Sequence, residues 1–238
     1  EKVAQAVAET LPTGTGMRVL EVGPGMGVLT KYLLKLHGAR LMAVEVDAES
    51  VDYLRQNLPD VNVMFGDFLK LNISDYFGSD DFMVIGNYPY NISSQIFFRV
   101  LEMRDRIPVC SGMIQKEVAE RIAAKPGSKT YGITSVLLQA FYDIEYVMTV
   151  HENVFNPPPK VKSAVIRMTR NNVQSLGCDE AMFIQIVKTA FNQRRKTMRN
   201  SLRPMLTDEL MNEEIFNRRP ETLTVSEFVE LTNMISKR

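Results

Sequence analysis

The stretch Met17-Arg18-Val19-Leu20-Glu21-Val22-Gly23-Pro24-Gly25-Met26-Gly27 reads as a buried strand that runs directly into a glycine-rich turn. Apolar residues at helical spacing over 29–36 predict that a helix follows the turn. Glycines at such a point let the backbone turn sharply and approach a ligand that a side chain would block. The dinucleotide-binding pattern G-x-G-x-x-G fails because its sixth position is Val28, so a dehydrogenase is disfavoured.

The alternation of β-rich runs and helical segments continues through the first two-thirds of the chain. We expect strands at 17–22, 40–46, 61–65, 82–86 and 108–114, with helices at 29–36, 48–57 and 94–104. Two more strands, at 141–150 and 163–168, are expected to end the sheet as an antiparallel hairpin. This order is typical of an open, mostly parallel sheet covered on both faces, and it predicts an α/β, Rossmann-like domain over 1–170.

The character of the chain changes beyond Arg170, where no convincing strand remains. Helical segments are expected at 179–191, around the basic residues 194–203, at 207–216 and at 225–236, the last capped by Thr224 or Ser226. We therefore predict a small helical domain over 171–238.

Composition limits the functions open to this chain. The 238 residues are 45% hydrophobic, enough for a full core, and no apolar run reaches the ~18 residues of a membrane span. With no signal-peptide pattern either, we expect a soluble, cytoplasmic protein. The two cysteines and two histidines are each isolated in the sequence, without the spacing of zinc ligands, so no metal is expected. A histidine-based catalytic triad is disfavoured for the same reason.

The net charge of zero hides a local excess of basic residues. Between 156 and 203 only Asp179 and Glu180 oppose them, and a polyanion partner leaves such a footprint. A solvated helix face that happens to be basic is the alternative, and the charge pattern alone does not separate the two. The basic residues are Lys160, Lys162, Arg167, Arg170, Lys188, Arg194, Arg195, Lys196, Arg199 and Arg203.

Two acids follow the second and third predicted strands. Glu45 ends the second strand, where a carboxylate can accept both hydrogen bonds of a ribose diol, and Asp67 follows the third, where it can accept from an adenine amine. No phosphate-binding Lys or Arg follows the glycine-rich turn. Either acid alone is more often a loop cap, but together with the turn they predict an adenosine ligand without phosphates, and hence S-adenosylmethionine.

Asn87-Tyr88-Pro89-Tyr90 follows the fourth strand and carries the chemistry. The Asn87 side-chain oxygen and the Tyr88 carbonyl could each accept one N–H of a base's exocyclic amine, aiming its lone pair at the sulfonium methyl. Pro89 restricts the Tyr88 backbone to extended conformations, and Tyr90 can stack on the base. The base must be single-stranded or flipped out to enter. An ordinary turn is the alternative for the tetrapeptide by itself.

Six segments of the chain resemble the KsgA/RsmA family, the rRNA adenine N6,N6-dimethyltransferases of the small ribosomal subunit. The resemblance covers essentially the whole chain and rests on residues 21–27, 44–47, 66–67, 86–94, 154–165 and 190–202. It implies a Rossmann-like S-adenosylmethionine-dependent methyltransferase fold with a C-terminal helical domain that binds rRNA. It also implies transfer of methyl groups to N6 of two adjacent adenosines near the 3′ end of 16S rRNA, within the small subunit or its precursor. We expect the protein to be monomeric.

The resemblance assigns roles to individual residues. The residues expected to contact the cofactor are Gly23, Gly25, Glu45, Asp67 and Asn87. Asn87 and Tyr90 are expected to hold the target base, with the ring of Phe155 on its other face. The residues expected to contact RNA are Lys160, Arg194, Arg195, Lys196 and Arg199. Two features depart from the family pattern. Tyr88 stands where Leu is usual, and the chain begins at Glu1 without the basic segment and Gly-Gln-x-Phe-Leu motif that contribute to the cofactor pocket, so weaker cofactor binding is expected where that segment is absent.

Three rival functions remain. The Erm type shares the fold and the tetrapeptide but methylates large-subunit rRNA, and the basic segment 191–202 argues against it. DNA adenine methylation is weaker still, because such enzymes generally carry a larger target-recognition domain. A non-catalytic ribosome-assembly factor is opposed by the intact Asn87 and Tyr90.

Overall fold

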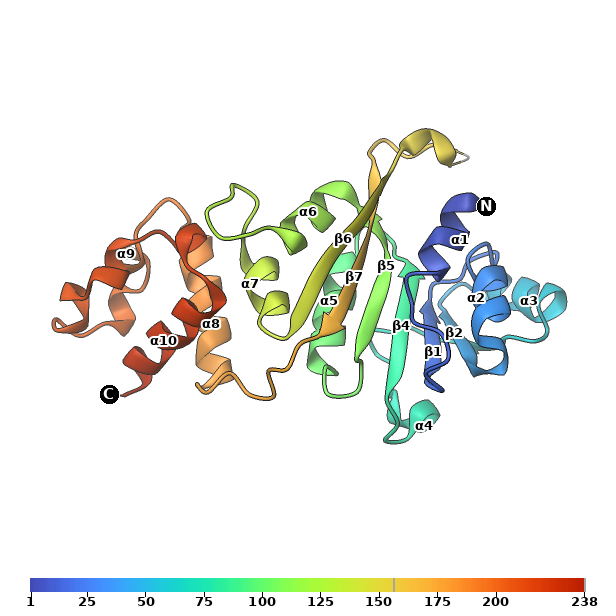
Figure 1. Cartoon of the computed structure of the whole chain (residues 1–238), viewed down its shortest axis with the longest axis horizontal. Coiled ribbons are helices and arrows are strands. Elements are labelled where there is room, and N and C mark those ends of the chain that lie inside the picture. The colour runs from blue at the N-terminus through green and yellow to red at the C-terminus, as the bar shows by residue number, and fades with distance from the viewer. Residues whose placement is uncertain (156, 238) are drawn as a thin grey trace. The chain divides into compact units, whose positions relative to one another are not determined.

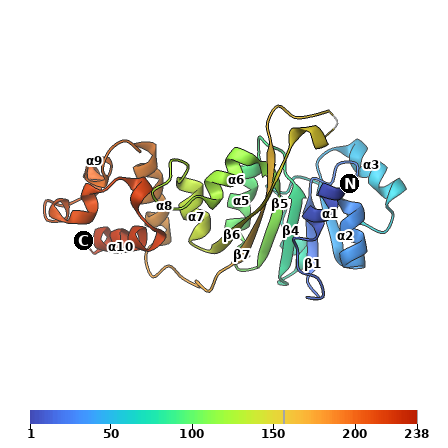
Figure 2. The same ribbon diagram turned by 45° about the horizontal axis from the view of Figure 1, so that its top comes forward.

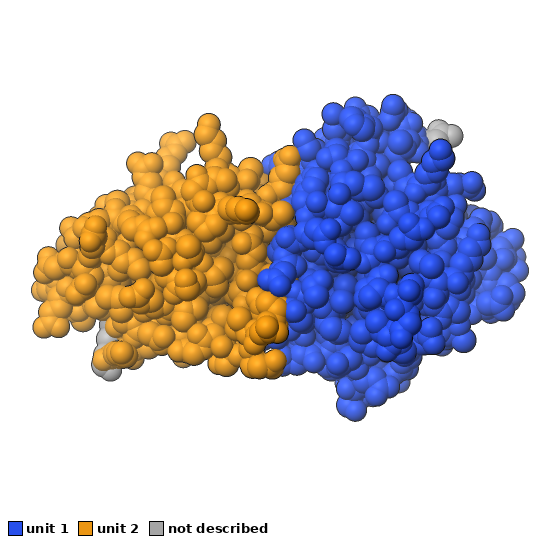
Figure 3. All heavy atoms as spheres, viewed as in Figure 1, with its two compact units in different colours: residues 1–119, 143–170 blue, residues 120–142, 171–238 orange. Residues whose placement is uncertain are grey.

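A computed structural model of the chain describes residues 1–155 and 157–237. The chain divides into two compact units, coloured separately in Figure 3. The first unit comprises residues 1–119 and 143–170, and the second comprises 120–142 and 171–238. These units differ from the expected domains 1–170 and 171–238 in that residues 120–142 group with the C-terminal part rather than with the sheet.

The first unit is built on a seven-stranded sheet of order β3-β2-β1-β4-β5-β7-β6 (Figure 1). The first five strands in this order are parallel, and β7 runs antiparallel to β5. All seven strands lie where the sequence predicts them, within two residues at each end. Their bounds are β1 Arg18–Val22, β2 Leu41–Glu45, β3 Asn62–Phe65, β4 Phe82–Asn87, β5 Val109–Gln115, β6 Tyr142–Val150 and β7 Ser163–Arg170.

Helices cover both faces of this sheet, with α1 and α5 on opposite sides (Figures 1 and 2). Side chains alternate along each strand, so Val19 and Glu21 face one side while Leu20 and Val22 face the other. The Val19 face packs against α1, α2 and α3 in one apolar cluster. The helices are α1 Lys2–Ala8, α2 Thr30–His37, α3 Ala48–Asn57, α4 Ser74–Phe77 and α5 Ser93–Glu102.

The strand order fixes where a ligand can bind. The chain leaves β1 toward β2 and β3, then returns to place β4 on the other side of β1, with Glu21 in register with Ile85. In open α/β sheets ligands bind at such a reversal, outside the carboxyl ends of the strands. The glycine-rich turn after β1 and Asn87 at the end of β4 flank this point.

The second unit is helical. Asp179 caps α8 by accepting from the Met182 N–H, and Thr224 and Glu227 form a reciprocal capping box on α10. Its core includes Phe183, Met198, Phe216, Phe228 and Leu231, all fully buried. The helices are α7 Ile133–Gln139, α8 Glu180–Asn192, α9 Met198–Ser201 and α10 Val225–Ser236, while α6 Lys116–Ala123 spans the boundary between the units.

Two helical predictions were wrong in the C-terminal part. The segment expected as a helix over 207–216 forms two short 3₁₀ turns, Leu210–Asn212 and Glu214–Asn217. Of its apolar residues only Phe216 is fully buried, so no helix face there packs on a core. Within the basic stretch 194–203, residues 194–197 belong to the connection from α8 to α9 and Met198–Ser201 form α9. Arg203 then begins a 3₁₀ helix, Arg203–Met205.

Candidate functional site

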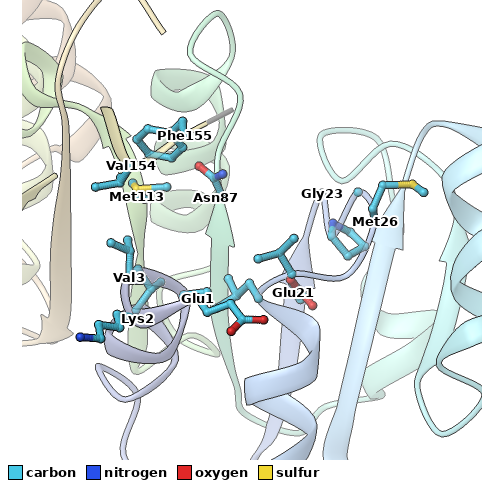
Figure 4. Close-up of a pocket in the computed structure, with 16 residues that line it drawn as sticks. Glu1, Lys2, Val3, Glu21, Gly23, Met26, Asn87, Met113, Val154 and Phe155 are labelled. Atoms are coloured by element: carbon cyan, nitrogen blue, oxygen red, sulfur yellow. The ribbon is translucent and has the colours of Figure 1, made fainter. Parts of the chain in front are cut away.

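A pocket of about 690 Å³ opens at the strand-order reversal of the first unit (Figure 4). Figure 4 shows Asn87 and Phe155 on one side of it and Glu21 and Gly23 on another. Its wall combines α1, the glycine-rich turn, the ends of β4 and β5 and the segment at 154–155. A cavity of this size suits a small-molecule ligand.

The glycine-rich turn brings bare backbone to the pocket. Gly23 and Gly25 have φ of 70° and 52°, a left-handed conformation that side chains rarely adopt. An added Cβ at either position would meet no atom within 4 Å, so the cost of a side chain there is conformational and not steric within the protein. Both glycines line the pocket, and their contact with the cofactor stays a prediction.

Glu45 is held rigidly beside this turn. Its Oε2 accepts from the Gly25 N–H at 3.0 Å, and its Oε1 accepts from the N–H groups of Val46 and Asp47 at 2.8 and 3.0 Å. The carboxylate is therefore fixed by the backbone of two strand ends at once. Oε2 keeps one acceptor site for a ligand hydroxyl, which is compatible with the expected ribose contact.

Asp67 stands at the end of β3, outside the residues that line the large pocket. Its Oδ1 accepts from the Leu69 N–H at 3.0 Å, and its Oδ2 lies 3.9 Å from Lys70 Nζ. Oδ1 of Asp67 therefore caps the following loop, which is the structural alternative to a cofactor contact for that oxygen. Contact with an adenine amine stays a prediction.

Asn87-Tyr88-Pro89-Tyr90 lies where β4 ends, and its residues differ in burial. The Asn87 side chain is exposed, whereas Tyr88 is 1% exposed and donates its hydroxyl hydrogen to the Ser111 carbonyl at 2.7 Å. The Tyr88 N–H also donates to the Met113 carbonyl. Tyr88 therefore anchors the tetrapeptide to β5, while Asn87 is left to face the pocket.

A second hollow, of about 290 Å³, adjoins the first. Both share Asn87 and Phe155 in their walls, and the second also contains Tyr90. The Tyr90 hydroxyl lies 2.7 Å from the Ser163 hydroxyl on β7, which fixes the ring on this wall. The three residues predicted to hold a base are thus brought together. Asn156, between Phe155 and the prolines of this wall, lies outside the described residues.

The residues predicted to bind RNA are distributed over both units. Lys160 is exposed in the first unit. In the second unit Arg194, Arg195 and Lys196 belong to the α8–α9 connection, and Arg199 lies within α9. Arg195 and Lys196 are exposed, and Arg194 donates to the Ser128 carbonyl at 3.1 Å within its own unit. The contacts of these five residues with RNA stay a prediction.

Glu21 is the pocket residue whose role the sequence analysis missed. It is 1% exposed, and its Oε2 makes no hydrogen bond among the described residues. Burial raises its pKa to about 8, and the nearby Glu45 carboxylate adds to the rise. The sequence did contain a signal for this residue, because Glu21 is an acid within the apolar run of a buried strand, two residues before Gly23.

Comparison with known proteins identifies the family. The family described as ribosomal RNA adenine dimethylase matches residues 1–237. The chain belongs to this family. A protein of Bacteroides fragilis described as ribosomal RNA small subunit methyltransferase A is 60% identical over 99% of this chain and 88% of its own length. A protein of the same description from Flavobacterium johnsoniae is 57% identical over 99% of this chain and 91% of its own.

Solved structures support the fold. A dimethyladenosine transferase from Plasmodium falciparum superposes with a TM-score of 0.83 at 22% identity, covering 99% of this chain and 96% of that one. The 23S rRNA methyltransferase ErmE gives 0.71 at 24% identity, with 98% of both chains covered. Membership of the rRNA adenine dimethylase family confirms the predicted fold class, the S-adenosylmethionine-dependent methyltransferase activity on rRNA adenine, and the cofactor.

Among residues 1–155 and 157–237, no helix is long and apolar enough to cross a membrane. Within the same residues, no three His, Cys, Asp or Glu side chains gather as metal ligands would.

Proposed function

We propose that this protein transfers methyl groups from S-adenosylmethionine to N6 of two adjacent adenosines near the 3′ end of 16S rRNA, giving N6,N6-dimethyladenosines. Its substrate in this proposal is the RNA within the small ribosomal subunit or its precursor, in the cytoplasm, and it acts as a monomer. Residues 1–170 carry the catalytic fold, and 171–238 form the helical rRNA-binding part.

The observation that supports this function best is the position of Asn87. This side chain lines both the 690 Å³ pocket and the adjoining 290 Å³ hollow, so one amide can face a ligand in each. A methyl donor in the larger pocket and a base in the smaller one would meet at Asn87. Proximity of this kind supplies much of the rate enhancement of a transfer reaction.

The donor side of the site is assigned to the turn and the strand-end acids. Gly23 and Gly25 offer bare backbone to the cofactor, Glu45 accepts from its ribose, and Asp67 accepts from its adenine. The buried, backbone-held position of Glu45 supports its role, because a fixed acceptor binds a diol without reordering. S-adenosylmethionine supplies an electrophilic methyl group on a positively charged sulfur.

The acceptor side positions the adenine amine. The Asn87 side-chain oxygen and the Tyr88 carbonyl oxygen each accept one N–H, so the nitrogen lone pair points toward the methyl carbon. The bound cofactor would supply the methyl group by cleavage of its C–S bond and leave as a neutral thioether, and the proton displaced from the nitrogen would pass to solvent. Tyr90 and Phe155 hold the two faces of the base. After the first transfer only one N–H remains, so one of the two hydrogen bonds must be absent in the second round.

Basic side chains support the choice of RNA as partner. Lys160, Arg194, Arg195, Lys196 and Arg199 are proposed to contact the phosphate backbone, which dominates the affinity of such complexes. The description of the 60% identical relatives as small-subunit methyltransferases supports the small subunit over the large-subunit target of the Erm type.

Methyl transfer to purified ribosomal RNA tests the proposal. Small subunits from a strain without these marks are incubated with the protein and labelled cofactor, alongside protein-free large-subunit RNA, and the RNA is mapped by mass spectrometry. We expect two adjacent dimethyladenosines in the small-subunit RNA. Asn87→Ala should lower the rate by about 10²–10³ while retaining subunit binding, because it removes one positioning acceptor. Label only in the large-subunit RNA would favour the Erm-type function, and label in neither would favour a non-catalytic assembly factor.

A further inference from the structure

The loop that joins α6 to α7 is a basic segment outside the RNA contacts proposed above. Residues 125–130 read Lys-Pro-Gly-Ser-Lys-Thr, and both lysines are exposed. The Lys125 carbonyl accepts from the Ser128 N–H at 3.2 Å, with Pro126 and Gly127 at the two central positions. Gly127 has a φ of 90°, which with the preceding proline is typical of a type II turn. The two lysines therefore flank a turn of defined conformation.

Both ends of this loop are fixed within the second unit. The Gln139 side-chain amide donates to the carbonyls of Ile122 and Ala124, each at 2.8 Å, and so joins α7 to the end of α6. At the other end the Tyr131 ring is fully buried and meets the Phe191 ring edge to face, with 6.0 Å between the ring centroids. Because packed and hydrogen-bonded anchors stand on both sides of residues 125–130, few conformations are open to the loop.

The α8–α9 connection holds the middle of the loop. Arg194 donates to the Ser128 carbonyl at 3.1 Å across 66 positions of sequence, and the Gly127 N–H donates to the Glu221 carbonyl at 2.6 Å. All these residues belong to the second unit, and Figure 1 shows the loop between α6 and α7 reaching toward α8. The loop and the connection therefore form one continuous surface.

Four exposed cations on this surface have no counter-charge in the protein. None of them makes an ion pair within residues 1–155 and 157–237, and neither segment contains an acid. Glu221, beside the loop, keeps its Oε2 buried. By contrast, Arg18 and Arg218 are each paired with a carboxylate. Cations gathered without counter-charges attract a polyanion, and RNA is the polyanion on which this family acts. The four are Lys125, Lys129, Arg195 and Lys196.

We propose that residues 125–130 are a further RNA-binding segment, in which Lys125 and Lys129 contact the phosphate backbone of small-subunit rRNA beside the contacts of Arg195 and Lys196. This role rests on the proposed function and extends its RNA-binding surface to a segment that precedes the predicted helical domain. Arg194 serves the surface twice, because one guanidinium N–H holds the loop while other donors remain for a phosphate.

Binding of the full chain to small-subunit RNA, measured between 50 and 200 mM salt, tests the role of the loop. Lys125→Ala with Lys129→Ala should weaken binding by roughly tenfold at about 100 mM salt. The slope of log K against log salt should decrease by about 1–2, since each phosphate contact contributes about 0.7–0.9. Lys31→Ala with Lys35→Ala removes two exposed cations from α2 and should leave affinity and slope unchanged.

Gly127→Ala separates the placement of the charges from their number. It keeps every charge, and its Cβ would meet no atom within 4 Å, but alanine at a φ of 90° is strained. It should weaken RNA binding by roughly two- to fivefold. Acetylation of lysines with and without RNA gives a direct readout, in which bound RNA should protect Lys125 and Lys129 and leave the exposed Lys237 reactive.

The outcomes separate the role of the loop from the proposed function. If the unmodified protein binds small-subunit RNA but Lys125→Ala with Lys129→Ala binds it equally well, or loses no more than the α2 control, the loop has no such role and the proposed function stands. If the unmodified protein neither binds nor methylates this RNA, both are overturned. Unchanged binding by Gly127→Ala, with both lysines still reactive in the complex, would show diffuse charge in place of a defined contact and would refute the proposal.

Discussion

At the scale of single residues, the position of Asn87 depends on how Tyr88 fits beneath it. The Tyr88 ring lies over the two glycines that face each other on β4 and β5, Gly86 and Gly112. A Cβ on Gly112 would lie 2.2 Å from the Gly86 carbonyl oxygen and 2.5 Å from a Tyr88 ring carbon. The Tyr that replaces the family's usual Leu is thus accommodated by space that only glycines leave.

We predict that Gly112→Ala destabilises the protein, because the clash is with backbone and with a fully buried ring. The free energy of unfolding in urea should fall by roughly 1–3 kcal/mol, as in other overpacked cores. Gly66→Ala is the matched control, since its Cβ would meet only Leu71 at an ordinary 3.7 Å. Equal effects of the two substitutions would contradict the packing described for Tyr88.

At the scale of elements, Arg194, Arg195 and Lys196 lie on a connection and not on a long helix face. Arg195 and Lys196 are exposed between α8 and α9, while Arg194 is bonded to the Ser128 carbonyl. Residues 194–197 are not helical, so a basic, solvated helix face does not describe this part of the basic segment. Short connections held by flanking helices present side chains in a defined direction, which suits phosphate contacts.

Replacing both exposed residues, Arg195→Ala with Lys196→Ala, should weaken RNA binding and reduce its dependence on salt. Each phosphate contact contributes about 0.9 to the slope of log K against log salt for duplexes and about 0.7 for single strands, so the slope should decrease by about 1–2. Binding to small-subunit RNA is measured between 50 and 200 mM salt, a range chosen to expose this term. Lys31→Ala with Lys35→Ala on α2 is the charge-matched control, and an equal loss there would refute a specific role for the connection.

At the scale of the whole molecule, stability at mildly acidic pH depends on a buried histidine. His37 ends α2 with 4% exposure, and its Nε2 has no hydrogen-bond partner in the described part of the chain. Burial lowers its pKa below 6.5, and the positive charge of Arg40 lowers it further. The unfolded chain therefore takes up a proton at a higher pH than the folded protein does.

The contribution of His37 is thus present above pH 6.5 and lost as the pH falls toward the lower pKa of the folded state. We predict that His37→Leu loses less stability than the unmodified protein between pH 7 and pH 5. The difference should change by at most about 1.4 kcal/mol per pH unit, the limit for one proton. Urea denaturation at a series of pH values measures it, and parallel curves would show that His37 does not titrate on unfolding.

Local patterns in the sequence were enough to predict the strands, the last helix and the strand ends at which the site residues lie. The alternation of β-rich runs with helical segments located all seven strands, and the glycine-rich turn, Glu45 and Asn87 were each placed at a strand end. The last helix was predicted to its first and last residue, because the Thr224–Glu227 capping box is a local signal. The 207–216 helix failed because its periodic apolar residues had no core to pack on.

Only the tertiary structure decided which of these strand ends act together. Parallel pairing at the β1–β4 reversal joins the glycine-rich turn to Asn87, and packing of the 154–155 segment adds Phe155, 68 positions further along the chain, to both pockets. The state of Glu21 was likewise invisible in the sequence, because a carboxyl group acquires an elevated pKa from the burial and neighbouring charge that folding creates. The sequence supplies the residue types and their local patterns. The distances between residues far apart in the chain, and the dielectric environment of each side chain, exist only once the chain has folded.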